Sequence, residues 1–113
     1  ILYPWAYQRA DSEDHQELAA LGDKMASAIY AAHGKSYKVM GGAQLYGASG
    51  TAMDWSYGER GALSFVVELR PARGRTGFVL PPEQIVPTCD EAYAATLELA
   101  EGMIRRQRET TER

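Results

Sequence analysis

Two stretches of the chain carry apolar residues at the three- and four-residue spacing of amphipathic helices. The first covers residues 13–33 and stops before Gly34, a residue typical of helix C-termini. The second begins at Thr88, where Glu91 three residues later predicts a capping box. Its apolar positions are Tyr93, Leu97, Ala100 and Ile104, with Ala92, Thr96, Leu99 and Met103 beside them. Beyond this helix, the tail from Glu109 is expected to fray.

Strand signals lie outside these helices. Residues 63–69 (Leu-Ser-Phe-Val-Val-Glu-Leu) are nearly continuous in apolar character, which favours a central strand covered on both faces. Residues 1–7 read as a second extended segment, in which Pro4 breaks the hydrogen-bond ladder. A short helix is predicted over residues 53–59 with Thr51 as its cap. The pattern indicates one α/β domain spanning residues 1–113.

Composition excludes several function classes. The net charge of −3 argues against a nucleic-acid or anionic-membrane surface, because both need clustered positive charge. No apolar run approaches the roughly 20 residues that span a bilayer. The single cysteine, Cys89, cannot form an internal disulfide and is expected to be a small buried hydrophobe. The basic stretch at residues 70–77 matches no phosphate-binding spacing and is read as a solvated turn.

Glu68 is the residue most suggestive of chemistry. A carboxylate late in an apolar strand is costly unless it faces a cleft, a charge or hydrogen-bond donors. The structural alternative is an ion pair with Arg70, two residues away on the same face. Tyr46 lies in a glycine-rich loop, and on its own it is interpreted as a surface aromatic. His15 and His33 lack a second ligand at metal spacing, so the sequence predicts no metal site.

The remaining aromatic residues have a plain structural interpretation. Trp5, Trp55 and Phe65 are expected to pack in the core or to be half-buried.

Four segments in register resemble a known family. They are Leu-Tyr-Pro-Trp-Ala-Tyr at residues 2–7, Leu-Tyr-Gly-Ala-Ser-Gly at 45–50 with Asp-Trp-Ser-Tyr at 54–57, Ser-Phe-Val-Val-Glu-Leu-Arg at 64–70, and Gly-Phe-Val-Leu-Pro at 77–81 with Gln-Ile-Val-Pro-Thr at 84–88. Their order and separations resemble the C-terminal third of zinc carboxypeptidases of the carboxypeptidase A and B type. The resemblance implies part of a mixed β-sheet with two amphipathic helices packed on it.

The resemblance also implies roles for individual residues. Glu68 matches the catalytic glutamate, which takes a proton from a zinc-bound water and later passes one to the leaving amine. Tyr46 matches a mobile tyrosine that closes over the substrate. Met53 matches the floor of the specificity pocket, where an uncharged residue favours apolar or aromatic C-terminal side chains, although the acidic Asp54 is adjacent. The other substrate-binding matches are Leu2, Ala6, Ala48, Val66 and Phe78.

In this family the zinc ligands come earlier in the sequence, as a His-x-x-Glu pair and a later histidine. We therefore expect a secreted parent exopeptidase that requires zinc and acts on the C-termini of peptides or proteins. We expect these residues to be a piece of it that binds no zinc and is inactive alone, associating with the missing N-terminal part or with itself. Two alternatives stay open: a non-catalytic interaction module derived from the same fold, and an unrelated small α/β binding domain.

Overall fold

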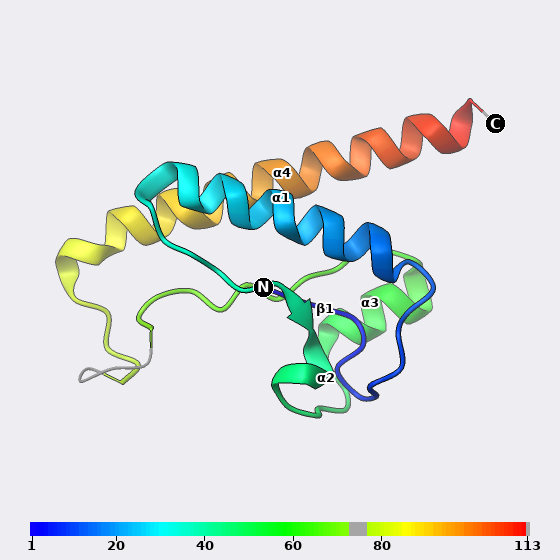
Figure 1. The fold of residues 1–113 in the computed structure, drawn as a ribbon, viewed down its shortest axis with the longest axis horizontal. Coiled ribbons are helices and arrows are strands. Elements are labelled where there is room, and N and C mark those ends of the chain that lie inside the picture. Colours follow the sequence, from blue (N-terminus) through cyan, green and yellow to red (C-terminus); the bar gives the residue numbers. More distant parts are fainter. Residues whose placement is uncertain (73–76, 113) are drawn as a thin grey trace.

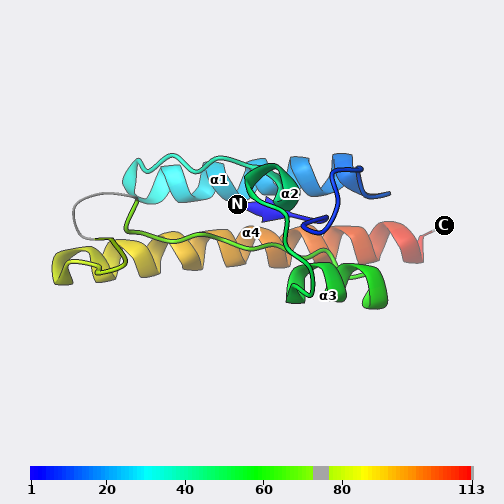
Figure 2. The same cartoon turned by 90° about the horizontal axis from the view of Figure 1, so that it is seen from below.

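The structure, a computed structural model, describes residues 1–72 and 77–112 and has two layers (Figure 1). One layer consists of helices α1 (His15–His33) and α4 (Ile85–Thr111), which lie side by side and run in opposite directions (Figure 2). The other contains strands β1 (Leu2–Tyr3) and β2 (Met40–Gly41) and helices α2 (Gly42–Leu45) and α3 (Ala52–Arg60). Part of the predicted basic turn, residues 73–76, lies outside the described residues.

Helix α1 confirms the predicted apolar stripe. Leu18, Leu21, Met25 and Ile29 are all buried along one side of the helix. At its end, Gly34 adopts a left-handed conformation with φ 69°, and its N–H donates to the Tyr30 carbonyl at 2.7 Å. A side chain at this φ would be strained, which is why glycine ends the helix here.

Helix α4 begins earlier and ends later than predicted. It follows the 3₁₀ turn η1 (Pro82–Gln84), and the Thr88 hydroxyl donates to the Gln84 carbonyl at 2.6 Å instead of capping the helix. Pro87 is tolerated in the first turn, where no backbone donor is needed. The helix continues through Thr111, so the prediction of fraying from Glu109 is wrong.

The face of α4 that packs on α1 is also different from the predicted one. Tyr93, Leu97 and Ile104 are 66%, 46% and 50% exposed. Of the predicted positions, Leu99 packs against the core, and the contact face otherwise carries small residues: Ala95 is buried, and a Cβ on Gly102 would lie 2.6 Å from Leu21 Cδ1. Small residues let the two helix backbones approach closely, and Leu21 fills the space between them.

Cys89, one turn into α4, is exposed, so the expectation of a buried hydrophobe is wrong.

Among the described helices, none is long and apolar enough to cross a membrane.

The sheet is small and mixed. β1 pairs in parallel with β2 through Leu2↔Met40 and Tyr3↔Gly41, and Leu2 makes an isolated antiparallel bridge with Val66. Residues 63–69 are therefore extended but do not form the predicted central strand, since Val66 is their one bridge in the described chain. The predicted α/β class, with two amphipathic helices on part of a mixed sheet, is confirmed.

Helix α3 confirms the predicted short helix and its cap. The Thr51 side chain accepts a hydrogen bond from the Asp54 N–H at 3.1 Å. Trp5 and Phe65 are partly buried against the main core, as predicted. Trp55 is exposed instead, and the Arg60 guanidinium lies 5.2 Å from the centre of its ring. An indole on the outer side of α3 can thus interact with a cation rather than with the core.

Candidate active site

The extended segments separate two apolar clusters, because successive side chains point to opposite faces. Tyr3 of β1 and the preceding Ile1 join the large core formed with α1 and α4, whereas Leu2 belongs to the cluster on the other side. There Leu2, Ala6 and Met53 form a second buried cluster, which we call the pocket cluster. Met40 and Ala48 pack against it and are partly buried.

Backbone hydrogen bonds hold the segments of the pocket cluster together. The Ala48 N–H donates to the Ala6 carbonyl at 3.0 Å, which ties the loop after α2 to the segment after β1. Gly42 packs so closely that a Cβ there would lie 3.0 Å from both Ala6 Cβ and Met53 Cε. A side chain where α2 begins would therefore press against Ala6 and Met53.

Asp54, the acid next to Met53, is bonded to backbone amides. Its carboxylate accepts from the Ala6 N–H at 2.9 and 3.0 Å and from the Tyr7 N–H at 3.1 Å. The residue is buried, and charge-assisted bonds of this kind are stronger than neutral ones. Met53, and not Asp54, is thus the residue of α3 that packs in the apolar cluster.

Residues 63–69 present alternate side chains to the two layers. Phe65 and Val67 pack against the helical core, while Val66 and Glu68 are exposed on the other face. The prediction of a strand covered on both faces is therefore wrong. On the exposed face, the Ser64 hydroxyl donates to the Met53 carbonyl at 2.7 Å, and Val66 bridges to Leu2. By alternation along this extended segment, Glu68 is expected on the same side as Val66.

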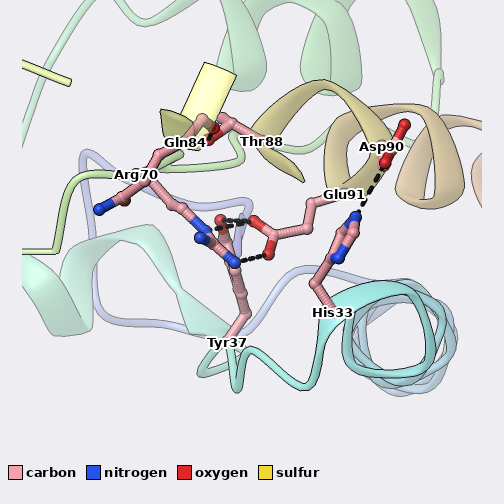
Figure 3. A network of polar contacts seen from close by, with 7 residues as sticks. All are labelled: His33, Tyr37, Arg70, Gln84, Thr88, Asp90 and Glu91. Carbon is pink, nitrogen blue, oxygen red and sulfur yellow. Dashed lines mark hydrogen bonds and ion pairs between the residues drawn. The ribbon is translucent and has the colours of Figure 1, made fainter. Parts of the chain in front are cut away.

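The alternative interpretation of Glu68, an ion pair with Arg70, is wrong. Arg70 makes a two-pronged ion pair with Glu91 of α4 instead (Figure 3). Of the polar contacts described for residues 1–72 and 77–112, none involves the Glu68 side chain.

The structure brings together some predicted site residues and leaves others apart. Those that share the pocket cluster are Leu2, Ala6, Ala48 and Met53, with Val66 bridging to Leu2 and Glu68 two residues further on. Tyr46 is 59% exposed at the end of α2, and Phe78 is fully exposed. Neither aromatic residue is part of the cluster.

A buried polar network beside Glu68 escaped the sequence analysis. The Glu91 carboxylate is fully buried and accepts from Arg70 Nε at 3.1 Å and from the Tyr37 hydroxyl at 3.0 Å, and a second Arg70 nitrogen donates to its other oxygen (Figure 3). Burial, followed by the bond to Glu91, raises the pKa of Tyr37 to about 12. The hydrogen bond to Glu91 also raises the pKa of Arg70.

A sequence signal for the network exists in the spacing of α4. Thr88, Glu91 and Ala95 follow one another at three- and four-residue steps, and all three are buried. The predicted capping box implies that Glu91 is exposed, and so it does not indicate this buried stripe.

The described residues do not fit a catalytic zinc site. Within residues 1–72 and 77–112, no three His, Cys, Asp or Glu side chains lie close enough to hold a metal ion. His33 Nε2 lies 2.8 Å from the carboxylate of Asp90, and His15 Nδ1 lies 3.5 Å from that of Asp11. Each histidine is therefore engaged by a single carboxylate.

Comparison with known proteins decides the family. The sequence model of a family described as "Zinc carboxypeptidase" matches residues 1–95. The chain belongs to the zinc carboxypeptidase family. Bovine carboxypeptidase O is 39% identical over 104 residues, which cover 91% of this chain and 28% of that protein. Bovine carboxypeptidase A1 is 38% identical over 104 residues, covering 89% of this chain and 24% of that protein.

Solved zinc carboxypeptidase structures share the arrangement of the chain. Bovine thrombin-activatable fibrinolysis inhibitor, in complex with tick carboxypeptidase inhibitor, superposes with a TM-score of 0.87 at 34% identity. That match covers 93% of this chain and 36% of the solved one. The family resemblance read from the four segments is thus confirmed, and the chain spans about a quarter of the length of the curated relatives that it matches.

Proposed function

We propose that residues 1–113 form the C-terminal part of a zinc carboxypeptidase catalytic domain, which hydrolyses the last peptide bond of peptides or proteins. In this proposal Glu68 is the carboxylate that accepts and returns protons during hydrolysis. The zinc would be held by polypeptide outside these residues, since the described residues do not fit a zinc site. On the family resemblance, we further propose that the enzyme is secreted.

The pocket cluster carries the proposal for substrate preference. Leu2, Ala6 and Met53 form it with apolar side chains, and the carboxylate of Asp54 is occupied by backbone amides. A basic C-terminal side chain would be buried without a counter-charge among these residues, which is costly. An apolar or aromatic side chain would carry no such cost. We therefore propose preference for substrates ending in residues such as Phe or Leu.

The outlying aromatic residues have proposed roles as well. Tyr46 follows the short helix α2 and is exposed, as a lid residue would be before substrate arrives. Phe78 is proposed to contact the residue before the substrate's C-terminal one. The remaining walls are proposed to be Ala48 and Val66, which adjoin Ala6 and Leu2 through backbone hydrogen bonds.

A hybrid enzyme tests the proposal. Residues 1–113 replace the aligned segment of bovine carboxypeptidase A1, and kcat/KM is measured on blocked dipeptides ending in Phe, Leu, Lys or Arg. We expect the Phe substrate to be favoured over the Lys substrate, and Met53→Asp to reverse the order. Glu68→Gln should lower kcat by at least ~100-fold, because general acid–base catalysis contributes that much or more.

The isolated chain provides the comparison. Residues 1–113 alone should neither hydrolyse the Phe substrate nor bind stoichiometric zinc. A hybrid that cleaves normally with Glu68→Gln would refute the catalytic role and favour a non-catalytic module. A preference for Lys in the unsubstituted hybrid would refute the role given to Met53.

A further inference from the structure

Glu68 lies between two anchor points of the extended segment. On one side, Val66 exchanges two backbone hydrogen bonds with Leu2, at 2.8 and 2.9 Å. On the other side, the Arg70 side chain is clamped by Glu91. None of the backbone hydrogen bonds described for residues 1–72 and 77–112 involves residues 67–69. Apart from the packing of Val67 against the helical core, the position of Glu68 therefore depends on the anchors two residues before and two residues after it.

The second anchor is rigid because of its chemistry. A guanidinium that pairs with both oxygens of one carboxylate is fixed in direction as well as in distance. The Tyr37 hydroxyl donates to the same carboxylate, so two other segments of the chain converge on Glu91 (Figure 3). Glu91 is fully buried on a helix of 27 residues, and the Arg70 side chain is 14% exposed. Water therefore offers these groups little replacement.

We propose that Glu91 is a positioning residue for Glu68: through Arg70 it holds the end of the extended segment, and thereby the carboxylate that does the proposed chemistry. This inference rests on the proposed function for its catalytic part and on geometry alone for the anchoring. Glu91 itself lies on the helix side of the sheet and does not contact a substrate. It acts only through the backbone between residues 68 and 70.

The anchoring is tested on the 113-residue chain by ¹⁵N relaxation, comparing Glu91→Gln with Asp90→Asn. Both changes replace an acid by its amide at adjacent positions of α4, but Asp90 contacts His33 and not Arg70. We expect the order parameters of residues 67–69 to fall from about 0.85 towards 0.6 in Glu91→Gln, while α1 is unchanged. Asp90→Asn should leave these residues rigid.

A milder variant guards against global unfolding. Tyr37→Phe removes one hydrogen bond to Glu91 and keeps the ion pair, so it should loosen residues 67–69 less than Glu91→Gln does. If residues 67–69 stay as rigid as wild type in both variants, or if Asp90→Asn loosens them equally, the anchoring is refuted.

The catalytic part is tested in the hybrid enzyme. Glu91→Gln should lower kcat by about 10- to 100-fold with KM changed less than twofold, since a displaced catalytic group affects the chemical step. The acid limb of the pH–rate profile should shift in Glu91→Gln and not in Asp90→Asn. If residues 67–69 loosen while kcat is unchanged, the anchoring stands and the positioning role of Glu91 in catalysis is refuted, while Glu68→Gln still decides the catalytic role of Glu68. If the hybrid is inactive throughout, the proposed function fails, and the relaxation data still decide the anchoring.

Discussion

The buried pair of Arg70 and Glu91 gives the sharpest stability prediction. Glu91→Leu leaves the Arg70 guanidinium without its counter-charge, and Arg70→Met leaves a fully buried carboxylate without its own. Breaking a buried ion pair by removing one partner costs about 3–5 kcal/mol. We expect Arg70→Met to lie at the upper end of this range, because Glu91 has no exposure and Arg70 retains some.

Removing both partners should restore most of the loss. Hydrophobic replacements of a whole buried ion pair are often neutral or stabilising. The double variant that combines Arg70→Met with Glu91→Leu would still leave the Tyr37 hydroxyl without its acceptor, which costs about 1–3 kcal/mol. We therefore expect the double variant to be within about 2 kcal/mol of wild type, and adding Tyr37→Phe to recover most of that difference.

The single and double variants form a double-mutant cycle, which is measured by urea unfolding with circular dichroism as the signal. The free energies of unfolding are compared at unchanged m-value, which shows that the unfolded states are equivalent. For a chain of this size, the loss from either single substitution corresponds to a fall in Tm of about 10–20 °C. If each single substitution costs below about 1 kcal/mol, or if the two costs simply add in the double variant, the pair is not coupled and the reasoning fails.

Three further predictions concern the network and the pocket cluster. The pKa of Tyr37 is about 12 in the folded chain and near 10 in the unfolded chain. Its contribution to stability is therefore complete below pH 10 and is lost as the pH rises through about 12. Urea unfolding should show a steeper loss of stability at alkaline pH in wild type than in Tyr37→Phe. Gly42→Ala should lower the free energy of unfolding, measured by thermal unfolding, by about 1–3 kcal/mol, because its Cβ would lie 3.1 Å from Ala6 Cα. The control Gly47→Ala meets no atom within 4 Å and should change the free energy of unfolding by less than about 0.5 kcal/mol. Asp54→Asn should cost about 1–3 kcal/mol in urea unfolding, since an amide replaces the charged acceptor of the Ala6 and Tyr7 N–H groups; an unchanged midpoint would contradict it.

Local signals in the sequence were sufficient where one element determines its own structure. The stripe from Leu18 to Ile29 and the left-handed Gly34 define α1, and Thr51 defines the start of α3. The buried face of α4 could not be predicted in this way, because it depends on which side chains of α1 and of the extended segment pack against it. Leu21 fills the space above Gly102, and Arg70 neutralises Glu91, so a glycine and an acid lie in the interface while Tyr93 lies outside.

The motif resemblance predicted some residues of the candidate site and missed others. Motif resemblance identified residues of the pocket cluster that are far apart in sequence, such as Leu2 and Met53, and the structure places them in contact. It did not identify Glu91, because the residue belongs to the helix layer and acts on Glu68 only through Arg70. Exposed Tyr46 and Phe78 stay predictions, since nothing in the described chain fixes their side chains in the cluster.

The geometry of the site is set by the core on the other side of the sheet. Leu2 belongs to the pocket cluster, and its neighbours Ile1 and Tyr3 belong to the helical core. A one-residue slip of β1 would move Tyr3 into the pocket cluster and Leu2 into the core, because side chains alternate between the faces. The core between the sheet and the helices thus disfavours a one-residue slip, and the observed register also pairs Leu2 with Val66, two residues before Glu68. Substitutions in the helical core should therefore disturb the candidate site through register, even where they contact none of its residues.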